Sequence, residues 1–280
     1  RCVRGAERRD TRHCEVMEAG CASRRCTVGE RLVRGESIRK PIQRAMLVRI
    51  GQLDAEHDPR LPCFPRGEEE LFTILRVFER LAGALHAAHE DNVIHRDIKP
   101  ANVIIDESGT PIILDFGLAR VGGDESSTLT MTGELFGTPA YMPPELLRGQ
   151  VLEPGPTLDV YALAITLYEC LTLKRPFDAG TPEAVYKQIL EDEVPSVREF
   201  HPELPSEVAV VIATALEKDL RRRYATALDF AEELRRICEH EPILAIPAGP
   251  GLRLKRWLQR HPALGTSIAG SVLILVVGLT

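Results

Sequence analysis

The octapeptide HRDIKPAN at residues 95–102 and the tripeptide DFG that begins at Asp115 constrain this chain more than any other feature of its sequence. Between them lie a short β-branched run, a Ser-Gly turn and a second short apolar run that ends at Asp115. This order predicts a β-hairpin, which would return Asp115 to the side of Asn102, where one divalent cation could contact both. Carboxylate and amide oxygens suit such a cation. Asp97 and Lys99 add a second carboxylate and an ammonium group to the same place.

Four later segments carry motifs that extend this pattern. They are GTPAYMPPE at residues 137–145, LDVYAL at 158–163, KRPF at 174–177 and EKDLRRRYATA at 217–227. Together with the octapeptide and DFG, they resemble the large lobe of the protein kinases, and the nearest likeness is to bacterial membrane-anchored Ser/Thr kinases of eukaryotic type. The resemblance runs from about Leu71 to Cys238. It implies an α+β, mostly helical fold: a kinase-like large lobe with a truncated or degenerate small lobe before it and a transmembrane helix after it.

The resemblance also implies an activity, the transfer of the γ-phosphate of ATP to Ser or Thr hydroxyls of proteins, with Mg²⁺. Asp97 would be the catalytic base that orients the hydroxyl, and Lys99 would neutralise charge on the transferred phosphoryl group. Asn102 and Asp115 would bind Mg²⁺ and, through it, ATP. Thr138 would hydrogen-bond near Asp97 and Lys99 and favour hydroxyl substrates.

Four further residues are expected to support the site. By the same resemblance, His95 packs under the catalytic loop and Asp159 holds that loop by hydrogen bonds. Glu145 is expected to pair with Arg223, although either of the two arginines before Arg223 could substitute for it. A buried pair of this kind contributes position more than stability.

Arg96 suggests regulation by phosphorylation. It resembles the arginine that clamps a phosphorylated activation loop through bidentate contacts. Thr130 and Thr132 lie between DFG and Thr138 and are the favoured phosphorylation sites. Autophosphorylation at these threonines would suit a homodimer.

Residues 1–66 are the difficulty for this interpretation. A complete kinase places a Gly-rich loop and a strand lysine before its large lobe, and neither GxGxxG nor VAIK occurs in this part of the chain. The segment Leu32–Ile38 resembles the hinge and the start of the helix that follows it, which leaves too few residues for a complete small lobe. The chain begins with Arg rather than Met. We therefore expect a fragment with weak or no activity by itself.

The C-terminal part predicts a membrane anchor. Residues 262–280 contain no charged side chain and approach the length that crosses a bilayer. Arg and Lys residues and Trp257 precede them, so the positive-inside rule places the catalytic part in the cytoplasm of a single-pass membrane protein. The alternative for this run is a buried core helix. The expected domains are an incomplete small lobe and hinge at 1–66, a large lobe at 67–240, a linker at 241–260 and a transmembrane helix at 261–280.

Charge and cysteine content limit other interpretations. Residues 1–66 carry 15 Lys and Arg against 9 Asp and Glu, a net charge of +6. Because the whole chain has a net charge of −6, the remaining residues carry −12. The basic part lacks interleaved aromatic residues and any binding motif, so no nucleic acid partner is expected. No two of the 7 cysteines have the Cys-x-x-Cys spacing of a zinc site, and we expect reduced, unpaired thiols.

Hydrophobic periodicity predicts helices at 71–90, 159–173, 182–193, 206–218 and 226–239;. His86 and His89 lie near the end of the first helix. Because no Cys or carboxylate partner is evident for a metal site, they are expected to be packed or solvated rather than metal ligands.

Two other functions compete with an active protein kinase. A pseudokinase, or non-catalytic signalling module, would explain the missing phosphate-cradling motifs, and a measurement of ATP binding would distinguish it. An aminoglycoside-type phosphotransferase shares a similar catalytic loop but should lack the GTPAY and PPE motifs that end at Glu145, so it is disfavoured.

Overall fold

The computed structural model describes residues 35–50, 59–116, 139–149, 155–246 and 249 in full, and the backbone alone of 14–20 and 27–33. The strands are β1 (Cys14–Gly20), β2 (Thr27–Val33), β3 (Gly35–Ser37), β4 (Val103–Asp106) and β5 (Pro111–Ile113). The helices are α1 (Arg39–Arg49), α2 (Glu68–Glu90), α3 (Pro144–Leu147), α4 (Pro156–Thr172), α5 (Pro182–Glu191), α6 (Val197–Phe200), α7 (Ser206–Ala215) and α8 (Ala227–Cys238). Among the described residues, the short 3₁₀ helices are η1 (Pro100–Asn102), η3 (Pro139–Tyr141) and η4 (Leu220–Arg222).

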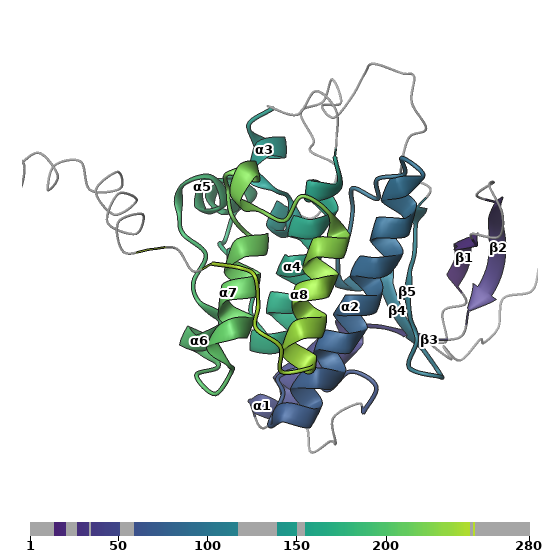
Figure 1. Cartoon of the computed structure of the whole chain (residues 1–280), viewed down its shortest axis with the longest axis horizontal. Coiled ribbons are helices and arrows are strands. Elements are labelled where there is room, and N and C mark those ends of the chain that lie inside the picture. Colours follow the sequence, from purple (N-terminus) through teal and green to yellow (C-terminus); the bar gives the residue numbers. More distant parts are fainter. Residues whose placement is uncertain are drawn as a thin grey trace, which may run out of the picture. The chain divides into compact units, whose positions relative to one another are not determined.

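Helix α4 forms the centre of the helical part. From Leu158 to Thr172, every residue except Glu169 is buried. Helices α2, α7 and α8 contact it from different sides (Figure 1). A helix that is enclosed all round must be apolar on all faces, and the sequence of α4 meets this requirement. The few polar side chains on α4 are therefore exceptions that call for partners.

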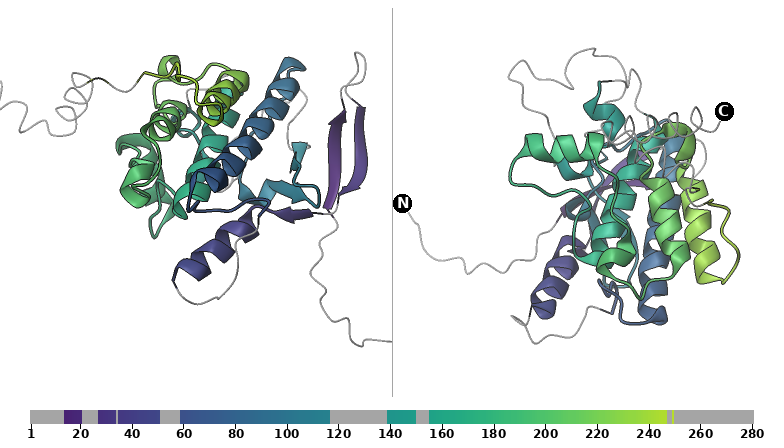
Figure 2. Two further views of the ribbon diagram at one scale, coloured as in Figure 1. Left: turned by 60° about the horizontal axis from the view of Figure 1, so that its bottom comes forward. Right: turned by 90° about the vertical axis from the view of Figure 1, so that its left-hand side faces the viewer.

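Helices α2 and α8 lie side by side over α4 (Figures 1 and 2). Helix α2 turns one apolar stripe inward, including Ile74, Leu75 and Phe78, all with 0% exposure. Phe230 and Leu234 of α8 are also fully buried. Glutamates in the first turn of α2 favour the positive end of the helix dipole. Because α2 ends at Glu90, it delivers the chain directly into the octapeptide 95–102.

The predicted hairpin is confirmed as strands β4 and β5 of a three-stranded antiparallel sheet with the order β3–β4–β5. The register pairs Val103 with Ile113. At the turn, Asp106 Oδ1 accepts hydrogen bonds from the backbone N–H groups of Ser108 and Thr110, each at 2.8 Å. The hairpin is thus determined by a β-branched run and by turn hydrogen bonds between residues only a few positions apart. For this reason the sequence alone could predict it.

Strand β3 joins this sheet from a part of the chain far away in sequence. Its residues pair with β4, with Gly35 opposite Asp106, and α1 follows directly. The range 32–38, expected to hold a hinge and a helix start, includes the end of β2 and all of β3, and the helix begins only at Arg39. The hinge stays a prediction. The described residues before α2 also include the β1–β2 hairpin.

The other helices differ from the predicted ranges by up to three residues at an end. Helix α4 begins at Pro156 rather than 159, because proline is well tolerated in the first turn, where its missing N–H is not needed. Helix α7 ends at Ala215 rather than 218. The described cysteines Cys63, Cys170 and Cys238 are free thiols.

The C-terminal expectations fall outside this description. The chain divides into two compact units, Arg1–Leu244 and Ala245–Thr280, and the predicted transmembrane segment 261–280 lies beyond the described residues. Within the described residues, no helix has both the length and the apolar character needed to cross a bilayer.

Gly35 should be required for the contact between β3 and β4. A Cβ atom at this position would lie 2.3 Å from Ile104 Cγ2 and 2.7 Å from the carbonyl oxygen of Ile105. We expect Gly35→Ala to lower the free energy of unfolding by about 1–3 kcal/mol, measured by urea denaturation. Gly83→Ala is the control, since a Cβ at that position in α2 meets nothing within 4 Å and should stabilise the helix by about 0.5–1 kcal/mol. Equal effects at both glycines would contradict the steric argument.

Candidate active site

The catalytic-loop residues converge on the carboxylate of Asp97. Its Oδ2 accepts a hydrogen bond from Lys99 Nζ at 2.6 Å and another from Asn102 Nδ2 at 3.0 Å. Asn102 Nδ2 also donates to the backbone oxygen of Asp97 at 2.8 Å. The side chains of Asp97 and Lys99 are 24% and 22% exposed, so an external substrate can reach both. Because the amide nitrogen of Asn102 is engaged by Asp97, its amide oxygen is the atom that can face a cation.

His95 lies buried beneath this loop, as expected, with 0% exposure. Its Nε2 donates to the carbonyl oxygen of Leu114 at 2.6 Å, and its Nδ1 accepts from the backbone N–H of Asp97 at 3.2 Å. One nitrogen must donate and the other must accept, so the ring is the neutral tautomer protonated on Nε2. The ring also meets Phe116 edge to face at 4.8 Å. His95 therefore ties the loop of Asp97 to the segment that carries Asp115.

Asp159 holds the same loop from below, also as expected. Its Oδ1 accepts the backbone N–H of Arg96 at 2.8 Å, and its Oδ2 accepts that of His95 at 2.8 Å. Arg96 has a φ of 68°, a left-handed conformation that is unfavourable for a non-glycine residue. The carboxylate thus stabilises a strained backbone next to Asp97.

His89 is the supporting residue that the sequence did not reveal. Its Nε2 lies 2.8 Å from Asp159 Oδ2; because a carboxylate can only accept, the imidazole donates. His89 was expected to be packed or solvated, and it is indeed buried at 8% exposure. The carboxylate partner lies 70 residues away, and no local pattern connects the two positions. His89 gives Asp159 its third N–H donor.

Asp115 lies just after strand β5, which the β4–β5 hairpin returns to the side of Asn102. The backbone N–H of Leu114 donates to the carbonyl oxygen of Asn102 at 2.8 Å, so Asp115 follows directly after a residue paired with Asn102. Asp115 itself is exposed and has a φ of 60°. Among the described residues there is no cluster of three or more His, Cys, Asp or Glu side chains that could hold a metal ion. One amide oxygen and one carboxylate still fit Mg²⁺, which usually keeps several waters and takes phosphate oxygens as further ligands.

Glu145 of α3 pairs with Arg223, the expected partner, and not with either of the two arginines before it. Arg223 Nη1 lies 2.6 Å from Glu145 Oε1, and Nη2 lies 3.0 Å from Oε2, with both residues buried. The guanidinium also donates to the backbone oxygens of Thr157 and Glu217. The two preceding arginines instead pair with Asp219 and Glu217. This bidentate pair anchors α3 to the start of α4 and the chain after α7.

Of the remaining expected residues, Arg96 is described by the structure and the three threonines are not. Arg96 has an exposed side chain, and among the described residues no ion-pair partner of its guanidinium is found. Thr130, Thr132 and Thr138 lie outside the described residues. Their roles stay predictions.

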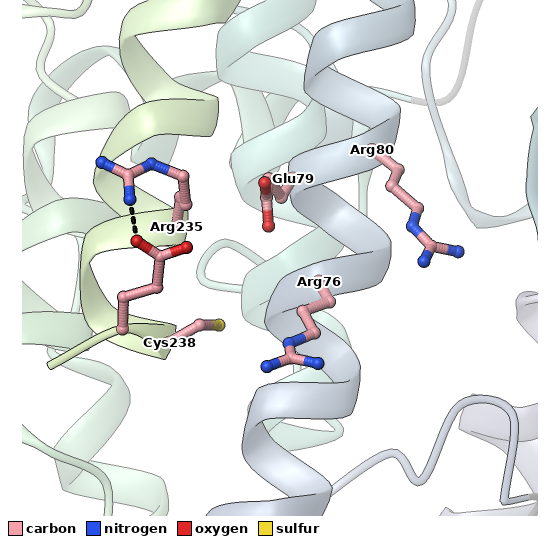
Figure 3. Close-up of a pocket in the computed structure, with 6 residues that line it drawn as sticks. Arg76, Glu79, Arg80, Arg235 and Cys238 are labelled. Atoms are coloured by element: carbon pink, nitrogen blue, oxygen red, sulfur yellow. Dashed lines mark hydrogen bonds and ion pairs between the residues drawn. The ribbon is translucent and has the colours of Figure 1, made fainter.

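A cavity of about 180 Å³ opens between α2 and α8 (Figure 3). It is lined by Arg76, Glu79, Arg80, Arg235, Cys238 and Glu239. It is smaller than the usual site of a drug-sized ligand, and none of its lining residues belongs to the catalytic loop. The cavity is therefore not part of the site around Asp97.

The contact between His89 and Asp159 should contribute measurably to stability. We expect His89→Leu to lower the free energy of unfolding by about 1–3 kcal/mol, because a buried carboxylate loses one of its donors. His86→Leu is the control: His86 lies on the same helix, with a 23% exposed side chain near Glu90, and should change stability by less than about 0.5 kcal/mol. Chemical denaturation of both variants tests this, and similar small effects would show that His89 does not support Asp159.

The chain is similar in sequence to known protein kinases. The protein kinase domain family matches residues 66–241. Serine/threonine-protein kinase PknB of Mycolicibacterium smegmatis is 38% identical over 157 residues, which make up 56% of this chain and 25% of PknB. Serine/threonine-protein kinase PknK of Mycobacterium tuberculosis is 35% identical over 196 residues, 68% of this chain and 17% of PknK. The chain thus spans a quarter or less of the length of these curated relatives. With the family match covering more than half of its residues, the chain belongs to the protein kinase domain family.

Proposed function

We propose that this chain is the catalytic large lobe of a bacterial Ser/Thr protein kinase, which transfers the γ-phosphate of ATP to Ser or Thr hydroxyls of protein substrates. The observation that carries the proposal is the arrangement around Asp97. A reachable carboxylate receives hydrogen bonds from Lys99 and Asn102, so its position is set before a substrate arrives. Preorganisation of this kind supplies most of the catalysis in phosphoryl transfer.

Each residue of the loop has a separate task in this reaction. Asp97 accepts the proton of the attacking hydroxyl and orients it. Lys99, which contacts Asp97 at 2.6 Å, stabilises negative charge that develops on the transferred group. Asn102 and Asp115 would hold Mg²⁺, whose charge offsets that of the ATP phosphates. Thr138 would help to select hydroxyl substrates.

Arg96 is proposed to read the phosphorylation state of the activation loop. Its side chain is exposed, and its backbone N–H is held by Asp159. The backbone of Arg96 therefore cannot shift freely. A phosphate on Thr130 or Thr132 would supply the bidentate acceptor that an arginine prefers. Autophosphorylation would take place within a homodimer.

The proposed organisation keeps the expected boundaries: small lobe and hinge at 1–66, large lobe at 67–240, linker at 241–260 and membrane helix at 261–280. The uncharged run 262–280 and its basic flank support a single-pass anchor with the kinase part in the cytoplasm.

Deleting residues 262–280 should release the protein from the membrane fraction after cell lysis, and unchanged fractionation would count against an anchor.

A pseudokinase or interaction module is the second candidate. It is favoured by one observation: residues 1–66 contain no Gly-rich loop and no VAIK lysine, so the phosphates of ATP lack their usual cradle. For the same reason, we propose that the 280-residue chain by itself has weak or no activity.

Activity should be tested on the full gene product with Mg²⁺, ATP and a generic Ser/Thr protein substrate. We expect phosphate transfer, with Thr130 or Thr132 also modified in the active enzyme. Asp97→Asn should lower the rate by at least about 10²-fold, because the hydroxyl loses its base, while circular dichroism shows an unchanged fold. ATP binding without transfer, or neither, would support the pseudokinase instead.

A further inference from the structure

Helix α1 is basic, whereas the lobe that follows it is strongly acidic. Residues 35–50, which include the whole helix, contain four basic side chains and one acidic one, a net charge of +3. Residues 67–240 contain 16 Lys and Arg against 31 Asp and Glu, a net charge of −15. A negatively charged surface would therefore repel most of the lobe and attract the part around α1.

The same helix exposes large apolar side chains at its C-terminal end. Met46, Leu47 and Ile50 are 49%, 40% and 58% exposed, and they make up three of the seven large apolar side chains that are exposed among the described residues. Their spacing of three and four places them on one side of the helix, and α1 lies at the edge of the lobe (Figures 1 and 2). Exposed apolar side chains that cluster in this way mark an interaction surface.

The cations beside this apolar cluster are held in place but not neutralised. Glu36 of β3 is the one acidic residue in the range 35–50. Its carboxylate oxygens lie within 3.7 Å of the cationic groups of Lys40, Arg44 and Arg60. One carboxylate shared by three cations leaves a net charge of +2. The side chains of Lys40 and Arg44 are still 48% and 38% exposed, so both can face an external anion.

Cations next to exposed apolar side chains on one helix are typical of contact with an anionic membrane surface. Two more exposed cations, Arg39 and Arg49, lie in the first and last turns of α1. Such side chains would attract phosphate headgroups, while the apolar cluster would enter the boundary between headgroups and acyl chains. The anchor proposed at 261–280 would keep a membrane close to α1 at a high effective concentration. A second copy of the acidic lobe would also attract α1, but the chain does not link the two copies.

We propose that α1 is a membrane-contact surface, which binds anionic phospholipid headgroups through its cations and the headgroup boundary through Met46, Leu47 and Ile50. The inference rests on the proposed anchor for the nearness of the membrane, and on the charge and exposure of α1 for the contact itself. Because the rest of the lobe is acidic, only this face can approach an anionic bilayer closely. The contact would thus fix which face of the lobe is turned to the membrane.

The test introduces Leu47→p-benzoylphenylalanine, a photoreactive residue, into the full gene product in vesicles of phosphatidylcholine with or without anionic phosphatidylglycerol. Leu220→p-benzoylphenylalanine is the matched control, because Leu47 and Leu220 are 40% and 42% exposed. We expect lipid crosslinks from position 47, about fivefold more with the anionic lipid than without it, and only background from position 220. Salt at about 1 M should remove this difference, because it shortens the range of charge interactions to about 3 Å.

Charge variants in the position-47 protein test the role of the cations. Arg39→Gln with Lys40→Gln should remove most of the gain from anionic lipid. Arg221→Gln with Arg222→Gln is the control, since it removes two exposed arginines from η4 and should leave the crosslinks unchanged. Circular dichroism confirms that each variant is folded.

Three results would overturn the inference: lipid crosslinks from position 47 no stronger than those from position 220, crosslinks that do not respond to the anionic lipid, or crosslinks to a second copy of the protein in place of lipid. Recovery of the protein with vesicles of phosphatidylcholine alone reports separately on the proposed anchor. If that recovery fails while position 47 still crosslinks to anionic lipid, the anchor falls and the contact surface stands.

Discussion

The carboxylate of Asp159 is the interaction on which the candidate active site depends. It is completely buried on a helix that other helices enclose, an environment where an unbonded charge would be very costly. Three N–H groups, from His89, His95 and Arg96, satisfy it at 2.8 Å each. Through these bonds, the rigid core holds a loop whose Arg96 has left-handed backbone geometry. They act together with the hydrogen bonds inside the loop, from Asn102 and His95 to Asp97, in holding the conformation that presents Asp97.

Helix α4 holds other segments of the chain through polar side chains near its two ends. Asp159 in its first turn holds the catalytic loop, and Glu169 near its last turn holds Tyr141. Close to its start, the buried Arg223 joins Glu145 to the backbone oxygen of Thr157. A close-packed core resists displacement. Groups that are hydrogen-bonded to α4 are therefore held in fixed positions. Residues that support a reactive group in this way matter as much as the group itself.

The catalytic loop and the DFG segment are coupled by a second route that does not involve α4. His95 donates to Leu114 and accepts from Asp97, so a single neutral imidazole joins the segments of the two acidic residues. The β4–β5 hairpin brings the same two segments together by backbone pairing, including the bond from Leu114 to Asn102. Asp97 and Asp115 are thus positioned relative to each other by both a side chain and a sheet. Such redundancy suits a site in which small displacements are expensive.

The sequence by itself determined the features that depend on near neighbours. The β4–β5 hairpin follows from a Ser-Gly turn between β-branched runs, and α2 follows from its helical period. Asp97, Lys99 and Asn102 could be grouped because they lie within eight residues of one another. The motif pattern also indicated the family, including the pairing of Glu145 with one of three adjacent arginines.

Only the tertiary structure decided which distant groups meet. His89 and Asp159 are 70 residues apart, and Tyr141 and Glu169 are 28 apart, and neither pair leaves a local pattern. The choice of Arg223 over its two neighbours depends on which guanidinium the fold buries between Glu145 of α3 and the backbone oxygen of Thr157 in α4. Turns and helices are selected by interactions over a few residues, whereas buried polar partners are selected by the close packing of helices that only the complete fold brings together.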